Sequence, residues 1–163
     1  MSVMKAALFC LVAFAATPLT SPASAQDVRP SYGTTVNLAT AKKLANSAIT
    51  EAQKNNWNIA VAIVDNHGLL VYYEMMDDTQ TGSAGVAIDK ARSAAMFRRP
   101  TRAFEDAINK GGRPSVLNLS GASAISGGMP VTVGGKIMGG IGVSGATADQ
   151  DEQVAKAGLE AVQ

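Results

Sequence analysis

Apolar residues recur with a helical period in two long stretches of the chain. Between residues 37 and 55 they form one stripe, made by Leu38, Ala41, Leu44, Ala45, Ala48, Ile49 and Ala52. This spacing predicts an amphipathic helix. Over residues 83–97 the same spacing is built mainly from alanines. It predicts a second helix, and its small side chains would let that helix lie close to a sheet.

Local signals delimit two further helices. Pro100 interrupts the second helix, and a short third helix is predicted over residues 101–110 because two glycines follow it. Thr147 and Gln150 have the spacing of a capping box. A last helix is therefore predicted from this point to about residue 162.

Two hairpins are predicted from β-branched and aromatic runs. Residues 58–64 and 69–75 flank a turn made by Asp65, Asn66, His67 and Gly68. Residues 131–133 and 136–143 flank a turn of two glycines. Residues 115–128 mix small and apolar side chains, and we expect a loop with one short strand there.

Strands that are joined mainly by hairpins predict an antiparallel sheet rather than alternating βαβ units. The expected fold class is α/β (α+β), with a five-stranded antiparallel sheet flanked by helices in the order α-ββ-αα-βββ-α. We expect one domain over residues 37–163, preceded by an extended arm over residues 26–36. With 163 residues in total, the chain is long enough to bury one core.

The first 25 residues have the pattern of a secretory signal peptide. Lys5 precedes a short apolar run, and Ala23, Ser24 and Ala25 supply an A-x-A cleavage site. The run is too short to span a bilayer. We therefore expect export, with the periplasm as first choice, and a mature chain that begins at Gln26 and needs no membrane.

Charge and cysteine content exclude several classes of function. The chain has 14 Lys and Arg against 13 Asp and Glu, and no basic stripe, which argues against nucleic-acid binding. The one cysteine, Cys10, lies inside the leader. The mature protein would thus have no disulfide and no thiolate metal ligand.

Glycine motifs of nucleotide-binding proteins are weak or missing. Gly140, Gly142 and Gly145 formally match a dinucleotide fingerprint, but no second βα unit fits after them. Neither a P-loop motif nor the G-x-S-x-G motif of serine hydrolases occurs. The glycines are better explained by a strand that another backbone approaches closely.

Three polar positions can converge at one end of the predicted sheet. Asp77 follows the first hairpin, Lys90 lies in the small-residue helix, and Gly127 and Gly128 precede the last hairpin. Lys90 is either a buried ammonium paired with a carboxylate or a surface lysine. The two glycines either present backbone N–H groups to an anion or form a plain tight turn. Asp77 is either functional or part of a solvated turn.

His67 is the single imidazole of the chain and lies at the tip of the first hairpin. It is either an exposed turn residue or a ligand of haem iron. Met76 and Met129 are candidate ligand contacts, with core packing as the alternative.

Several motifs in a fixed order resemble the GlcG/HbpS family of haem-binding-type domains. The similarity covers residues 38–163, and no single motif is distinctive. Its main segments are Val64-Asp65-x-x-Gly68, Met76-Asp77, Asp89-Lys90-Ala91-Arg92, Pro100-Thr101, Ser126-Gly127-Gly128-Met129-Pro130 and Gly139-Gly140-Ile141-Gly142. The chain departs from the family pattern around Met76-Asp77, where Met75 replaces a common arginine and Asp78-Thr79 replace Gly-Ala.

The resemblance implies a profilin-like fold and assembly into homo-oligomers, from dimers to octamers. Some members of the family bind haem outside the cytoplasm, are linked to haem degradation, and interact with sensor proteins. The shared motifs do not specify a haem ligand, so none is transferred.

Two functions of different class follow. The first is an exported, oligomeric haem-binding protein that degrades or senses haem, with a possible sensor-protein partner. Its axial ligand would be His67 or an oxygen donor, and Arg98, Arg99 or Lys90 would lie near the propionates. The second is a cofactor-free enzyme for a small hydroxy or keto acid. Lys90 and Asp77 would be its catalytic acid/base pair, and the Gly127–Gly128 turn would hold the carboxylate.

Overall fold

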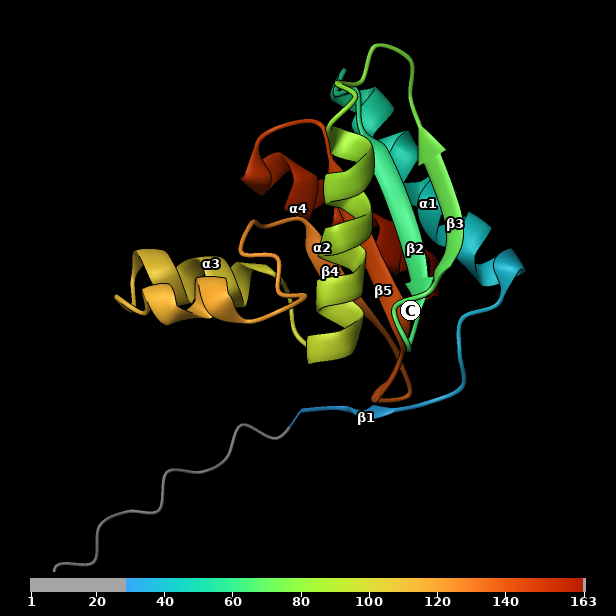
Figure 1. The fold of residues 1–163 in the computed structure, drawn as a ribbon. Coiled ribbons are helices and arrows are strands. Elements are labelled where there is room, and N and C mark those ends of the chain that lie inside the picture. The colour runs from blue at the N-terminus through green and yellow to red at the C-terminus, as the bar shows by residue number, and fades with distance from the viewer. Residues whose placement is uncertain (1–28, 163) are drawn as a thin grey trace, which may run out of the picture.

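The computed structural model describes residues 29–162 (Figure 1). The predicted signal peptide lies outside these residues. The elements within them are β1 (Ser31–Tyr32), α1 (Leu38–Lys54), β2 (Ala60–Asp65), β3 (Leu70–Met75), α2 (Ser83–Phe97), α3 (Arg102–Asn109), the 3₁₀ segment η1 (Pro114–Asn118), β4 (Gly128–Val133), β5 (Lys136–Ser144), α4 (Ala148–Leu159) and the 3₁₀ segment η2 (Glu160–Val162). The predicted α+β class, the four helices and both hairpins are confirmed.

β5 is the central strand of the sheet. It pairs antiparallel with β4 and with β2, and β2 pairs antiparallel with β3. β1 pairs with the start of β5 in parallel, with Ser31 opposite Lys136. The sheet therefore has five strands, but one of them is parallel.

The fifth strand is not where the sequence analysis placed it. The prediction of a strand within residues 115–128 is wrong: this segment contains η1, which starts at a proline and is mostly exposed. Its apolar residues do not alternate, so they offer no face that a sheet could bury. The fifth strand is instead β1, within the predicted arm, where the Gly33 N–H also donates to the Ile137 carbonyl oxygen over 2.8 Å.

Helices cover both faces of the sheet. Figure 1 shows α2 crossing one face, with α1 and α4 behind the other. The larger core lies on the side of α1 and α4, where Leu44, Ile63, Ile141 and Val143 are fully buried. The thinner core under α2 is built from alanines and valine, namely Ala60, Ala62, Val64, Ala87, Ala91 and Ala95.

The backbone of α2 lies almost directly on β5. A Cβ atom placed on Gly140 or Gly142 would collide with the carbonyl oxygens of Ala91 or Ala87. Any side chain at these two positions would push the helix away from the sheet. The close approach expected from the small residues of α2 thus also requires glycines on the strand.

The segment that contains α3 and η1 stands away from the rest of the domain (Figure 1). It is anchored at its base by Phe104, which is buried and packs edge-on against Phe97 with ring centroids 5.3 Å apart. Arg99 lies over this ring, with its guanidinium carbon 5.3 Å from the centroid.

Replacing Gly142 by alanine tests the contact between α2 and β5. We expect Gly142→Ala to lower the free energy of unfolding by about 3 kcal/mol, because the new methyl group overpacks a backbone contact. Urea denaturation measures the change. Gly85→Ala is the matched control, since a Cβ on Gly85 of α2 meets no atom within 4 Å. That control should gain about 0.5–1 kcal/mol from helix propensity. Equal stability of the two variants would contradict the close approach.

Candidate functional site

Lys90 forms a buried ion pair between three elements. Its Nζ donates to Asp151 Oδ2 over 2.7 Å and to the carbonyl oxygen of Val143 over 2.9 Å. The two side chains are 1% and 3% exposed. Asp151 Oδ1 also accepts the Ala146 N–H over 3.0 Å. The pair therefore joins α2, the end of β5 and the first turns of α4.

The position of this pair follows from the close packing described above. A Cβ on Gly127 would lie 2.9 Å from the Lys90 Nζ, so only glycine leaves room for the ammonium. Burial raises the pKa of the Asp151 carboxyl, and the hydrogen bond and positive charge of Lys90 act in the opposite direction. Of the alternatives left open for Lys90, the structure shows the buried, paired ammonium.

The structure does not bring Asp77 to Lys90. Asp77 is exposed on the turn that follows β3, whereas Lys90 is sealed inside the domain. The carboxylate that meets the ammonium is Asp151, which the sequence analysis did not single out. Asp151 lies in the first turns of α4, four residues after the capping threonine. Acidic residues are common there on exposed helices, so the sequence suggests a surface position.

The Gly127–Gly128 turn lies beside Lys90, as expected, but three of its four backbone polar groups already have partners. The Gly128 N–H donates to Thr101 Oγ1 over 3.0 Å, and its carbonyl oxygen accepts the Thr101 N–H over 2.9 Å. The Gly127 carbonyl oxygen accepts the Val143 N–H over 2.9 Å. Both glycines are buried, so this turn is not the anion-binding mouth that was expected for it.

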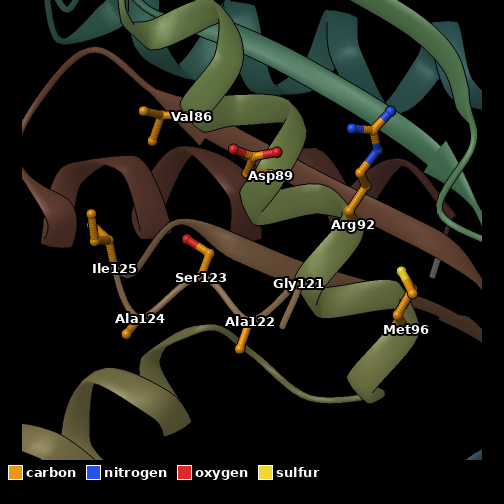
Figure 2. A pocket seen from close by; sticks show the side chains of 9 residues that line it. All are labelled: Val86, Asp89, Arg92, Met96, Gly121, Ala122, Ser123, Ala124 and Ile125. Atoms are coloured by element: carbon orange, nitrogen blue, oxygen red, sulfur yellow. The ribbon is translucent and has the colours of Figure 1, made fainter. Parts of the chain in front are cut away.

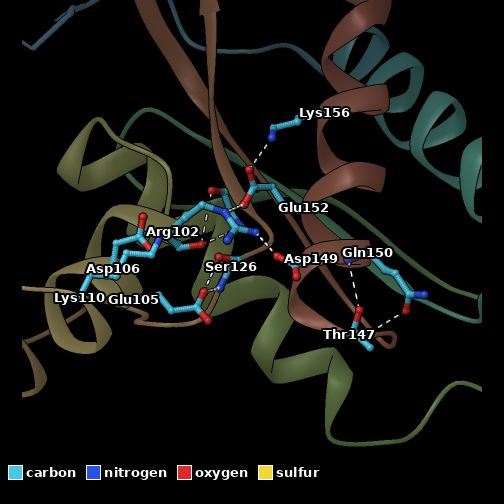
Figure 3. Close-up of polar contacts among 12 residues, drawn as sticks. Arg102, Glu105, Asp106, Lys110, Ser126, Thr147, Asp149, Gln150, Glu152 and Lys156 are labelled. Atoms are coloured by element: carbon cyan, nitrogen blue, oxygen red, sulfur yellow. Dashed lines mark hydrogen bonds and ion pairs between the residues drawn. The ribbon is translucent and has the colours of Figure 1, made fainter.

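A second group of charges joins α3 to α4 (Figure 3). Arg102 donates to Asp149 over 2.5 Å and also to Glu152, and Lys156 pairs with Glu152 over 2.5 Å. Burial alone would raise the pKa of Glu152, but its hydrogen bonds with Lys156 and Arg102 outweigh burial and lower it. Each charge has a partner in this network, which indicates a structural role.

A wide hollow lies on the outer side of α2. It has a volume of about 550 Å³ and runs between α2 and the loop of residues 121–125 (Figure 2). A bond from the Ser123 N–H to Ser93 Oγ, 2.9 Å long, holds the loop to the helix. The residues that α2 contributes are Val86, Asp89, Arg92 and Met96.

A neighbouring hollow of about 350 Å³ is lined by Tyr32, Asn66, His67 and Met96. Met96 lines both hollows, so the two are neighbours near the end of α2. Arg92, which lines the wider hollow, donates its Nε hydrogen to the Gly68 carbonyl oxygen over 3.0 Å. We call the two hollows together the α2 groove.

Polar groups in the α2 groove are only partly used. Tyr32 donates its hydroxyl hydrogen to the Met96 carbonyl oxygen over 2.8 Å, which ties β1 to the end of α2. Asn66 donates to the Gly33 carbonyl oxygen over 2.8 Å, but its Oδ1 is buried and accepts no hydrogen bond from the described residues. Asn66 therefore keeps one buried acceptor that has no partner among the described residues.

The predicted ligand-binding residues are divided between the groove and the core. His67 lines the groove and is exposed. Arg98 lies over the ring of Tyr32, which lines the same hollow as His67, at 5.3 Å from the ring centroid, and donates to the Pro30 carbonyl oxygen. Arg99 stacks on Phe104 instead. Met76 and Met129 pack against the core on the side of α1 and α4, on the opposite face of the sheet from α2.

The sequence analysis missed most of the residues on the groove side of α2. Val86, Asp89, Arg92 and Met96 are spaced at three, three and four residues, which places them on one face of the helix. This face lies opposite the alanine stripe. The spacing of these polar and apolar residues between the alanines could therefore have predicted the second, outward face of the helix.

Comparison with known proteins places the chain among haem-related domains. Residues 36–160 match the family model described as "Haem degrading protein HbpS-like". Protein GlcG of Escherichia coli (strain K12) is 44% identical over 94 residues, which cover 58% of this chain and 69% of GlcG. The resemblance indicated by the sequence motifs is confirmed.

Solved structures have the same fold. A double mutant of HbpS from Streptomyces reticuli is 31% identical, with a TM-score of 0.74 over 90% of this chain and 99% of that one. A structure described as a PduOC:Heme complex is 24% identical, with a TM-score of 0.71 over 79% of this chain and 96% of that one. Among residues 29–162, no helix is both long and apolar enough to cross a membrane.

Removing the Lys90 ammonium tests the buried ion pair. We expect Lys90→Met to lower the free energy of unfolding by about 3 kcal/mol, because it leaves the Asp151 carboxyl buried without its counter-ion. The double variant Lys90→Met, Asp151→Asn should recover at least half of that loss, since no buried charge remains. Urea denaturation of both variants measures this. A double variant less stable than Lys90→Met would contradict the interpretation.

The Glu152 network predicts a specific acid dependence. Because the pKa of Glu152 in the folded protein lies below its ordinary value of 4.5, the ionised carboxylate stabilises the fold above that pH. This contribution is lost as the pH falls through the folded pKa. Glu152→Gln should cost about 1–2 kcal/mol at neutral pH, and the two stability curves should converge below pH 4.5. Thermal unfolding from pH 7 to pH 3 tests this. Glu160→Gln, at an exposed carboxylate in η2, is the control and should leave the curve parallel to that of the wild type.

Proposed function

The chain belongs to the HbpS-like family of haem-degrading proteins, and on that basis we propose that it binds haem in the α2 groove. The observation that carries the proposal is the position of His67. The single imidazole of the chain lines a hollow that shares Met96 with the wider hollow beside α2. Imidazole is a common protein ligand of haem iron.

The residues of the α2 groove fit haem in three ways. His67 offers an exposed imidazole nitrogen for the iron. Arg92 is exposed and has N–H donors beyond the one that binds Gly68, so it can pair with a propionate. Val86 and Ile125 offer apolar contacts for the porphyrin plane. When bound, haem supplies an iron whose remaining coordination positions are open to protein ligands.

The chemistry of the donor set favours haem over a bare metal ion. In the part of the chain that the structure describes, no three His, Cys, Asp or Glu side chains gather where they could hold a metal. A lone histidine can complete the coordination of an iron that a porphyrin already holds. It cannot by itself provide a coordination shell.

The structure narrows the set of side-chain cations that can pair with the haem propionates. Lys90 was one candidate, but its ammonium is buried in the pair with Asp151 and does not reach the groove. Arg99 stacks on Phe104. Arg92 and Arg98 remain: Arg92 binds the carbonyl oxygen of Gly68, the residue after His67, and Arg98 covers the ring of Tyr32.

Export and assembly form part of the same proposal. The leader pattern of residues 1–25 supports a periplasmic or secreted protein. Family membership supports assembly into a homo-oligomer and a partnership with a sensor protein. It also supports a role in haem degradation or sensing, although haem binding alone is what the groove residues explain. The acid/base alternative loses the pair that was assigned to it, since Lys90 is buried against Asp151 whereas Asp77 is exposed.

A haemin titration of the purified protein tests the proposal. We expect a saturable Soret band at stoichiometric haemin. His67→Ala should weaken binding at least tenfold, which corresponds to about 1.4 kcal/mol. Arg92→Gln should weaken it by a few-fold through the loss of a propionate partner.

Lys42→Gln is the matched control for charge, because Lys42 is an exposed lysine of α1, on the other side of the sheet. Its affinity should equal that of the wild type. The absence of a Soret shift at stoichiometric haemin would refute haem binding. Equal affinities of the wild type and His67→Ala would remove the assigned ligand.

A further inference from the structure

Another hollow lies at the end of the sheet where β2 begins and β3 ends. It has a volume of about 470 Å³, within the range of about 300–1,000 Å³ that small-molecule sites occupy. Three segments line it: the turn after α1, the turn after β3 and the connection from β5 to α4. The six residues of β2 separate this hollow from the turn that carries His67, so it is distinct from the α2 groove.

Amide side chains dominate the lining of this hollow. Its polar and aromatic members are Asn56, Asn58, Gln80, Gln150, Asp78 and Trp57. Among the described residues that line it, none is Lys, Arg or His, whereas Arg92 and His67 line the α2 groove. An amide group offers both donors and an acceptor, and an ionised carboxylate offers acceptors only. The hollow therefore suits a neutral ligand with several hydroxyl groups and offers no side-chain cation to an anion.

Most of these polar groups are available to a ligand. Asn58, Asp78 and Gln80 are exposed, and their side chains form no hydrogen bond or ion pair with the described residues. The Gln150 amide oxygen accepts the Thr147 N–H over 3.0 Å and so closes the capping box of α4. Its amide nitrogen donates to no described residue. Donors and acceptors of the hollow are thus left for water or for a ligand.

Trp57 supplies the apolar surface of the hollow. Asn56, with a φ of 56°, adopts the left-handed conformation that ends α1, and the Trp57 N–H donates to the Ala52 carbonyl oxygen over 3.0 Å. The half-buried Trp57 side chain packs against the core and also lines the hollow. The negative face of an indole attracts the C–H groups of a sugar ring, while neighbouring amides bind its hydroxyl groups.

We propose that this hollow binds a neutral sugar or sugar-alcohol unit. The carbon skeleton of the ligand would lie against Trp57, with hydroxyl groups paired to Asn58 and Gln80. A phosphate or carboxylate group would instead face Asp78 without a cation to balance it. Each hydrogen bond to the ligand replaces one to water and gains little, so we expect affinity in the millimolar range. The proposal is independent of haem binding, because the two sites share no lining residue.

A titration followed by NMR tests the proposal directly, because Trp57 is the only tryptophan of the chain. Its indole N–H resonance reports on this hollow. The full chain is titrated with glucose, galactose, mannose and sorbitol, and we expect a saturable shift of this resonance with at least one of them. The double variant Asn58→Ala, Gln80→Ala should lower the affinity at least tenfold. Both replaced side chains are exposed and unpaired, so folding should be retained.

Asn46→Ala is the matched control, because Asn46 is an exposed asparagine of α1 that does not line the hollow. It should bind with the affinity of the wild type. Glucuronate, which adds a negative charge to the frame of glucose, should bind more weakly than the neutral sugars. No saturable shift with any of the four probes would overturn the proposal. A shift that persists unchanged in the double variant, or tighter binding of glucuronate, would also overturn it.

Discussion

The contact between the backbone of α2 and the glycines of β5 determines where the remaining groups of the molecule can lie. A helix normally packs on a sheet through a layer of side chains. Here Gly140 and Gly142 remove that layer on the strand, and Ala87 and Ala91 reduce it on the helix. The axis of α2 is consequently drawn close to the sheet, and a long side chain of the helix can reach past it.

Lys90 makes use of this short distance. Its ammonium reaches the carbonyl oxygen at the end of β5 and the carboxylate of Asp151 on α4, on the far side of the strand end. In water-free surroundings such a pair contributes little net stability but strongly disfavours arrangements that separate the charges. The pair therefore fixes how far along the sheet α2 sits and how it is rotated, and the rotation decides which of its residues face outward.

Much of the fold was predictable from the sequence, because its signals are local. The stripe of α1, the capping box of α4 and both hairpins depend on short-range spacing, and all were found. β1 was missed because two residues cannot carry a pattern, and it forms only where Gly33 and Tyr32 meet β5 and α2. The pairing of Lys90 with Asp151 spans 61 positions, and nothing in either neighbourhood indicates the other. The sequence could indicate burial of Lys90, but it could not indicate that Asp151 is its partner.

The residues of the α2 groove also show that local sequence patterns do not reveal which side chains tertiary packing brings together. His67 was recognised as a candidate because it is the only imidazole, and this argument needs no structure. Met96 was not, since a methionine in a helix is usually core. Only the rotation of α2 turns it outward.

The bonds from Arg92 to Gly68 and from Tyr32 to Met96 hold the hairpin turn and the N-terminal arm against α2. A helix locked by glycine contacts and a buried ion pair is a rigid support for groups that must bind a ligand, and ligands held on rigid elements lose little entropy when they bind. The polar interior of this domain and its exposed groove are thus two consequences of one packing arrangement.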